Sequence, residues 1–300
     1  MSTTVKSSAT EKVFPIDRRF FKALLIITKP GIVALSLVAG WTGLYIGSHG
    51  IPGYYEFVWT TLGLGLATAG AATLNNFIDR DIDLVMKRTS TRSLPSGSLS
   101  PSFAYMYGTG LAIISLIITQ YYLGTLVTLL TGAAIFTYVI LYSLFLKRTT
   151  PMATHIGGIG GALPPLIGYA AAHGNLDTHA LILFLIIVVW QQPHFWALAL
   201  KYKNEYAAAG VPILPVAKGI KATKVRLFWY TLALLPVSVL PYTSGMSGIY
   251  YLATAIVLGI AYLGFTVQFL YSQKEKEMFL FFFSIVYLGV LFVALILDMV

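Results

Sequence analysis

The chain has 300 residues, of which 57% are hydrophobic and only 10% are charged. An ordinary soluble domain carries about 25% charged residues, so a soluble protein of this length would lack the polar side chains to cover its surface. The composition therefore indicates a polytopic membrane protein. The absence of cysteine excludes thiolate catalysis and iron–sulfur ligation. The formal net charge is +9, but its placement points to the membrane rather than to nucleic acid, and we expect no nucleic-acid partner.

Nine apolar segments are long enough to cross a bilayer as helices, which takes about 20 residues each. They lie at roughly 24–46, 55–76, 102–121, 124–146, 156–173, 178–200, 226–243, 248–271 and 279–298. The fifth is interrupted by Pro164 and Pro165, which is tolerated where neighbouring helices satisfy the freed backbone groups. The sequence predicts an all-α protein with nine transmembrane helices.

When the chain is divided into these nine spans, all of the positive charges fall on one side of the membrane. Every lysine and arginine falls in the N-terminal tail and the first turns of the first span, or in a loop region from an even-numbered span to the next one. By the positive-inside rule, the N-terminus and these basic loops face the cytoplasm of a cell membrane. The N-terminal segment lacks the basic-then-apolar order of a signal peptide. We therefore expect a cytoplasmic tail, 1–23, and one transmembrane domain, 24–300.

The densest polar cluster closes the second span. Asn75, Asp79 and Asp83 are spaced by four residues, which places them on one face of a helix. Three such oxygen-bearing side chains repel one another unless a cation lies among them, and hard oxygen ligands suit Mg²⁺. Asp81 points away from this face and is expected at the surface. The alternative is a solvated helix end paired with cations such as Arg80, but ionisable groups beside an apolar segment favour a functional site.

Two basic segments are expected at the same membrane face. The first contains Arg88 and Arg92, and the second contains Lys147 and Arg148. Their cations could neutralise a diphosphate, for which arginine offers two parallel donors. The alternative is that both are ordinary basic loops of a membrane protein. Their position beside the acidic cluster favours anion binding.

A third cluster closes the sixth span, where His194 is followed by Lys201, Glu205 and Tyr206. A lone buried histidine is more often a hydrogen-bonded core residue than a ligand, and no two histidines have the spacing of a zinc site. The glycines of the fifth span have two open interpretations. They allow close helix packing, or they thin the wall to admit a large apolar substrate.

These residues resemble a known family. The pattern Asn75-x-x-x-Asp79-x-x-x-Asp83 is similar to the first acidic motif of the UbiA intramembrane prenyltransferases, and further phrases resemble the haem-farnesylating branch of that superfamily. These phrases are Thr28-Lys29-Pro30, Arg88-Thr89-x-x-Arg92-x-Leu94-Pro95-x-Gly97, Leu146-Lys147-Arg148-Thr149-Thr150-Pro151, Ile156-Gly157-Gly158-x-x-Gly161-Ala162-x-Pro164-Pro165, Trp190-Gln191-x-Pro193-His194-Phe195-x-Ala197-Leu198-Ala199 and Ala209-Gly210-x-Pro212-x-Leu214-Pro215. Departures from the family pattern are Ser93, Met152-Ala153, Tyr169 and the segment Lys201-x-x-x-Glu205, which stands where other branches have a second acidic motif.

The resemblance implies a UbiA-type helical bundle that transfers a farnesyl group from farnesyl diphosphate to a vinyl group of haem B, with addition of water, in a Mg²⁺-dependent reaction. It implies a metal site at Asn75, Asp79, Asp83 and Glu205. It extends the catalytic set to Arg88, Arg92, Lys147, Arg148 and Lys201, and assigns substrate contacts to His194, Tyr206 and Asn76. The implied partners are the two substrates and the lipid bilayer, with a haem A synthase as a candidate.

Two other functions remain open at this point. The first is a related prenyltransferase that acts on an aromatic or quinone precursor. The second is a transporter or channel with an acidic gate. Against the second, the polar clusters lie at one membrane face, and no chain of ionisable residues crosses the middle of the spans as ion pathways require.

Overall fold

A computed structural model of the chain describes residues 18–272 and 276–300, and these residues form helices. An isolated β-bridge between Ser247 and Met299 is the only strand-like pairing among them. The predicted all-α class is confirmed. Most of the predicted tail, with Lys6 and Lys12, lies outside the described residues, as does Lys274.

Eight helices among the described residues are long and apolar enough to cross a membrane. They are α2 (Pro30–Gly47), α3 (Tyr54–Ile78), α5 (Pro101–Tyr122), the continuous run of α6 (Thr125–Ile135), the π-helix η1 (Phe136–Leu146) and α7 (Lys147–Thr149), α10 (Thr178–Lys201), α13 (Gly219–Thr243), α14 (Ile249–Tyr271) and α15 (Glu277–Leu297). The shorter helices are α1 (Arg18–Ile27), α4 (Arg80–Val85), α8 (Ala153–Ala162), α9 (Pro164–His173), α11 (Lys203–Ala208) and α12 (Leu214–Ala217).

The fifth predicted span is the pair α8 and α9, which is broken at Leu163. Pro164 follows directly, and because proline has no backbone N–H, it cannot continue the hydrogen-bond ladder of α8. With this broken crossing added to the eight continuous helices, the described part of the chain has the nine crossings that were predicted.

Two predicted boundaries were wrong. The first span was expected as one helix over 24–46, but α1 ends at Ile27 and α2 begins at Pro30. Lys29 between them has a φ of 54°, and the residue before a proline is disfavoured in the helical region. The seventh span begins at Gly219 rather than at 226, because its basic first turns lie beyond the apolar segment and still form helix.

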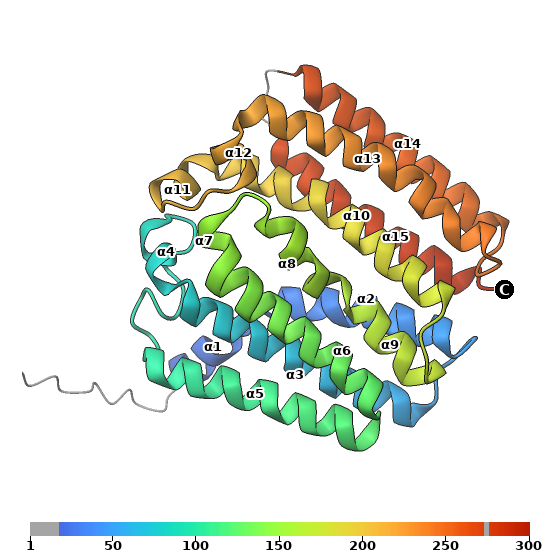
Figure 1. Cartoon of the computed structure of the whole chain (residues 1–300), viewed down its shortest axis with the longest axis horizontal. Helices are drawn as coiled ribbons and strands as arrows, with labels where there is room; N and C mark the ends of the chain where they lie inside the picture. The colour runs from blue at the N-terminus through green and yellow to red at the C-terminus, as the bar shows by residue number, and fades with distance from the viewer. Residues whose placement is uncertain (1–17, 273–275) are drawn as a thin grey trace, which may run out of the picture.

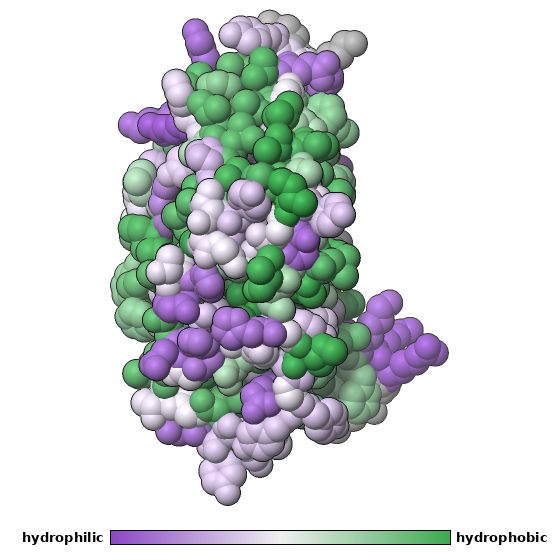
Figure 2. Space-filling model, turned by 90° about the vertical axis from the view of Figure 1, so that its right-hand side faces the viewer, coloured by the Kyte–Doolittle hydropathy of each residue, from purple (hydrophilic) through white to green (hydrophobic). Residues whose placement is uncertain are grey.

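The helices form one bundle in which α10 is central (Figure 1). The N-terminal helices pack as the pairs α2–α9, α3–α5 and η1–α8, while α13, α14 and α15 pack together on the other side of α10. The short helices α4, α7, α11 and α12 gather at one end of the bundle, on the left of Figure 1. All described lysines and arginines belong to this end or to the first turns beside it, so we refer to it as the basic end. Figure 2 looks onto the opposite end, where hydrophobic side chains cover much of the surface between polar patches.

Glycines bring α2 and α9 into backbone contact. A Cβ atom on Gly43 would meet the backbone of Pro165, and one on Gly168 would meet the backbone of Gly40. Within α8, Gly157 lies against the ring of Tyr142. The helix-packing interpretation of these glycines is therefore confirmed, since small residues at an interface let helices approach closely.

Gly168→Ala is expected to destabilise the fold, because the added methyl group has no space and overpacking costs about 1–3 kcal/mol. The matched control is Gly289→Ala, since a Cβ there meets nothing within 4 Å. Thermal unfolding of both variants in the same detergent would measure the difference. Equal unfolding temperatures for the two variants would contradict this account of the interface.

Candidate functional site

The centre of the site is a buried group at the carboxyl end of α3. The Asn75 side-chain nitrogen donates to Asp79 Oδ2 at 2.8 Å and to Ser143 Oγ at 2.8 Å. Lys147 Nζ donates to the same Asp79 oxygen at 2.5 Å. Asn75 and Asp79 are both buried, so this ion pair is largely shielded from water. We refer to Asn75, Asp79, Ser143 and Lys147 as the Asp79 node.

The π-helix η1 positions two members of the node. Ser143 Oγ donates to the carbonyl of Tyr138, five residues earlier, at 2.8 Å, in keeping with the wider π-helical turn. Ser143 lies on η1 and Lys147 is the first residue of α7, which continues η1 without a break, so the two side chains meet Asn75 and Asp79 respectively. π-Helical turns are often found at functional sites.

Asp83 is held by a second ion pair. Arg92 Nη1 donates to both carboxylate oxygens of Asp83, at 2.9 and 2.8 Å. The intervening loop folds back onto α4, where Thr89 Oγ1 donates to the Asp83 carbonyl at 3.2 Å. Asp79, between α3 and α4, and Asp83, on α4, are thus both buried, and each carboxylate is paired with a cation from another segment.

Lys29 is a member of the site that sequence reasoning missed. Its Nζ donates to Asn75 Oδ1 at 2.6 Å. Burial, with a smaller contribution from the nearby Arg92, lowers the pKa of Lys29 to about 7, although the negative charge of Asp79 acts to raise it. The available signal was a lysine directly before the proline that begins α2.

Lys29, Asn76 and Arg92 line a small cavity of about 60 Å³ next to the node. The Asn76 side-chain nitrogen donates to the Ile27 carbonyl at 2.8 Å, while its Oδ1 is buried without a hydrogen-bond partner. Asn76, predicted as a substrate contact, thus ties α3 to α1 and presents one free acceptor.

Arg148 does not lie with Lys147 in the node. It donates to both Asp81 oxygens at 2.7 Å and to the Ile78 carbonyl at 2.8 Å, so it clamps the end of α3 from outside. The Asp81 side chain is 62% exposed, which confirms the expected surface position. The bond from Arg148 lowers the pKa of Asp81 to about 2.

This clamp is expected to have a small, pH-dependent effect on stability. The folded-state pKa of Asp81 lies below the ordinary value of 3.8 for this side chain. The ionised carboxylate therefore stabilises the fold above about pH 4, and this stabilisation is lost as the pH falls toward 2. Exposed pairs contribute less than about 1 kcal/mol. Asp81→Asn should therefore lower the unfolding temperature slightly at pH 7, and the difference from wild type should shrink at pH 3. A difference that grew on acidification would contradict this reading.

The segment after the sixth span docks onto the loop after α4. Glu205 Oε2 accepts a hydrogen bond from the Arg88 backbone N–H at 2.9 Å, and the Arg88 guanidinium lies 4.9 Å from the centre of the Tyr202 ring. Tyr206 packs against a small apolar cluster around Ile82. Glu205 and Arg88 are thereby brought together at the basic end, where Glu205 holds the loop that follows α4.

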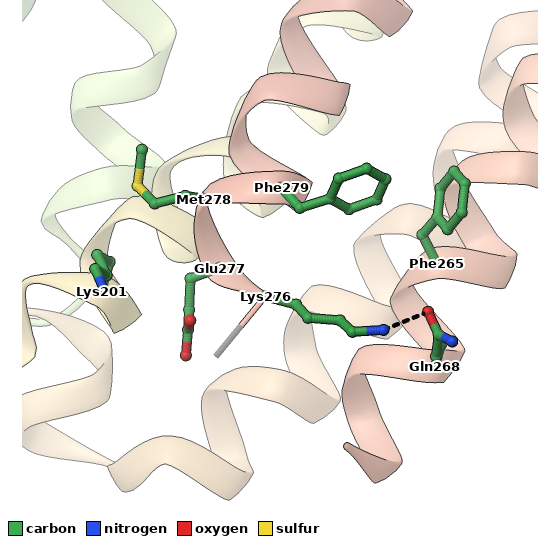
Figure 3. A pocket seen from close by; sticks show the side chains of 7 residues that line it. All are labelled: Lys201, Phe265, Gln268, Lys276, Glu277, Met278 and Phe279. Carbon is green, nitrogen blue, oxygen red and sulfur yellow. Dashed lines mark hydrogen bonds between the residues drawn. The ribbon is translucent and has the colours of Figure 1, made fainter. Parts of the chain in front are cut away.

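Lys201 lies in a different place. With Gln268, Lys276 and Glu277 it lines a pocket of about 350 Å³ among α10, α14 and α15, next to the rings of Phe265 and Phe279 and the side chain of Met278 (Figure 3). Lys276 Nζ donates to Gln268 Oε1 at 2.9 Å. None of the lining residues belongs to the Asp79 node, so the structure does not bring Lys201 together with the acidic motif.

His194 is a packed core residue. Its ring stacks between Trp190 and Phe281, at centroid distances of 4.8 and 4.4 Å, and its Nδ1 is 2.7 Å from Ser284 Oγ. Both ring faces are therefore covered. This matches the core interpretation rather than the predicted substrate contact.

The residues present suit a magnesium ion. Asp79 Oδ1 is buried and has no hydrogen-bond partner, and Asp83 and Asn75 add further hard oxygen donors. Among the described residues there is no group of three or more acidic, histidine or cysteine side chains that could hold a metal. Mg²⁺ requires no such group, because it typically binds one or two carboxylates and completes its shell with water and phosphate oxygens.

The fold is shared with solved membrane proteins. A digeranylgeranylglyceryl phosphate synthase superposes with a TM-score of 0.78 at 18% identity, over 93% of this chain and 98% of that one. A UbiA homolog from Archaeoglobus fulgidus, bound to DMAPP and Mg²⁺, superposes with a TM-score of 0.65 at 14% identity, over 93% and 99% of the two chains. At these identities the likeness concerns the fold.

Sequence relatives are much more similar. A protoheme IX farnesyltransferase of Aquifex aeolicus is 52% identical over 279 residues, which cover 93% of this chain and 96% of the relative. One of Marinobacter nauticus is 41% identical over 275 residues, which cover 91% of each chain. The sequence profile of the UbiA prenyltransferase family matches residues 36–295. A match over most of the chain, together with a buried acidic motif at the basic end of a nine-crossing bundle, means that this chain belongs to the UbiA prenyltransferase family.

Proposed function

We propose that this protein converts haem B to haem O by transferring a farnesyl group from farnesyl diphosphate to a haem vinyl group. The main observation in support of this reaction is the Asp79 node, a buried ion pair at the end of an apolar helical bundle. The acceptor is inferred from the name that the sequence relatives described above share, protoheme IX farnesyltransferase.

The first task of the site is to release diphosphate. Lys147 belongs to the node, Lys29 donates to its Asn75, and Arg92 pairs with Asp83. These three cations would neutralise the charge that grows on the leaving group as the allylic C–O bond breaks. Asn75, Asp79 and Asp83 would hold Mg²⁺, which supplies further positive charge to the diphosphate oxygens. Because these cations are already fixed by hydrogen bonds, little reorganisation is needed when the bond breaks.

The second task is to protect the farnesyl cation. Tyr138 and Tyr142 on η1 are stacked, with ring centroids 5.8 Å apart, and Tyr142 lies within electrostatic reach of Asp79 and Lys147. Aromatic faces stabilise a nearby cation, and the surrounding apolar helices keep water away from it. The pair of tyrosines is thus suited to face the isoprenyl chain beside the node.

In the bond-forming step, the vinyl π electrons attack C1 of the farnesyl cation and form a carbon–carbon bond. The positive charge moves to the carbon next to the macrocycle, where a water molecule adds and loses a proton. The product carries a hydroxyethylfarnesyl group. We propose that this takes place in the cell membrane with the basic end in the cytoplasm, and that a haem A synthase is a candidate to take up the product.

The test is mass spectrometry of haems extracted after incubating the purified protein with haem B, farnesyl diphosphate and Mg²⁺. The expected result is a haem heavier by one farnesyl group and one hydroxyl group, absent when EDTA is added and restored by excess Mg²⁺. Unchanged haem, together with diphosphate release when an aromatic acid or quinone precursor is offered, would overturn the haem assignment and favour a related prenyltransferase.

A further inference from the structure

Buried polar atoms without a partner concentrate between two helices. Among the described residues, eleven buried side-chain nitrogen or oxygen atoms have no hydrogen-bond partner, and five of them lie on α8 and α10. These five atoms are Thr154 Oγ1, His155 Nδ1, Gln191 Nε2, Gln192 Oε1 and Trp196 Nε1. We refer to these residues as the α8–α10 seam.

The members of the seam are in contact with one another. Gln192 Nε2 donates to the Thr154 carbonyl at 3.3 Å, and the His155 ring centroid lies 5.4 Å from that of Trp196. Gln191 lies directly over the Cα of Gly158. Gln191, Gln192 and Trp196 are 2%, 1% and 0% exposed, so bulk water does not satisfy their free atoms.

Such a cluster needs a partner, because each unsatisfied buried polar group costs about 1–3 kcal/mol. The free atoms are uncharged and include both donors and acceptors. The aromatic surfaces of Trp196 and Tyr230 adjoin His155. Neither an isoprenyl chain, which has no polar atoms, nor a diphosphate, which needs fixed cations, matches this lining. A flat aromatic ligand with polar atoms at its edge does.

Helix α8, which carries Thr154 and His155 of the seam, also packs against a helix of the Asp79 node. Gly157 of α8 packs against the ring of Tyr142, and Tyr142 is within electrostatic reach of Asp79 and Lys147. A ligand in the seam would therefore contact the same helix, α8, that packs against one of the tyrosines we place beside the farnesyl chain. Arg226 is close enough to His155 to act on it electrostatically. It forms none of the ion pairs found in the described part of the chain. Its guanidinium could therefore pair with an acidic group at the edge of the ligand.

We propose that the α8–α10 seam is the acceptor subsite, and that His155, rather than His194, is the histidine that contacts the macrocycle. This inference rests on the proposed function, because it takes haem B as the acceptor. His155 presents a buried ring nitrogen without a partner, whereas both faces of His194 are covered and its Nδ1 is bonded to Ser284. Gln191 and Gln192 are assigned as positioning residues at the edge of the ring system.

The experiment compares His155→Ala and Gln191→Leu with wild type in detergent. Haem B binding is titrated through the Soret absorption band, and the KM for each substrate is measured separately. We expect the Kd and KM for haem B to rise at least tenfold in both variants, with the KM for farnesyl diphosphate within twofold of wild type. The Soret maximum should also shift in His155→Ala. The matched control is His173→Ala, which lies at the opposite end of the bundle beside Asp177 and should change neither constant.

The outcomes separate this inference from the proposed function. If both variants bind haem B with the wild-type Kd and KM while wild type produces haem O, the seam holds only water and the acceptor assignment is overturned. If wild type binds haem B through the seam but forms no haem O, the subsite is supported and the proposed reaction fails. A general loss of structure is recognised by an equal rise in the KM for both substrates. In that variant such a result would count against the assignment. Gln191→Leu, which changes the side-chain volume little, is then the deciding variant.

Discussion

Asp79→Asn is expected to lower kcat for farnesyl transfer by about a hundredfold to a thousandfold, or more. The substitution keeps the shape of the side chain and removes its charge. Asparagine has one neutral oxygen where aspartate has two charged ones. It therefore cannot both replace the charged acceptor of Lys147 and offer a charged oxygen in place of the buried Oδ1 that has no partner, which is the oxygen best suited to a metal. The measurement is single-turnover formation of haem O at saturating Mg²⁺ and farnesyl diphosphate.

The control for this variant is Asp81→Asn, two residues away. Asp81 carries the same charge on the same helical segment, but it lies outside with Arg148 and should leave kcat within twofold of wild type. Asp83→Asn should behave like Asp79→Asn, because its carboxylate is buried with Arg92. Wild-type turnover by Asp79→Asn would refute the assignment of the node as the diphosphate and metal site.

Lys147→Met is expected to give the second largest effect, a loss in kcat of about a hundredfold. The variant removes a cation held 2.5 Å from Asp79, so the leaving diphosphate loses part of its neutralisation. It should also destabilise the fold by about 3 kcal/mol or more, because breaking a buried pair leaves an uncompensated charge. Kinetics and thermal unfolding on the same preparation measure both effects.

A double-variant comparison separates the two roles of Lys147. In Asp79→Asn with Lys147→Met the buried charge is no longer unpaired, so much of the stability should return while activity stays low. Lys224→Met serves as the control, because Lys224 donates to the Phe269 and Ser272 carbonyls at the end of α14 and belongs to no part of the site. Full activity of Lys147→Met would show that this cation acts only in folding.

Much of the site could be predicted because its chemistry is local in the chain. Asn75, Asp79 and Asp83 are separated by four residues, so helical geometry predicts that they lie on one face. In the structure Asn75 and Asp79 are bonded to each other, and Asp83 is buried on the next helix. His194 could not be assigned in the same way. A histidine in an apolar segment has the same sequence pattern whether its ring meets a ligand or, as found, stacks between two aromatic rings.

The sequence by itself determined the class of the protein, its nine crossings and the end at which its charges gather, because hydropathy and charge act over segments of about 20 residues. The tertiary structure alone decided which basic residue meets which acid. Lys147 reaches Asp79 across 68 positions of the chain, and Lys29 reaches Asn75 across 46. Arg148, the neighbour of Lys147, turns outward to Asp81. In the sequence all of these are basic residues of the same end of the molecule, and nothing distinguishes one from another. Only the packing of α1, α3 and η1 selects which of them enter a shielded interior, where an ion pair is strong.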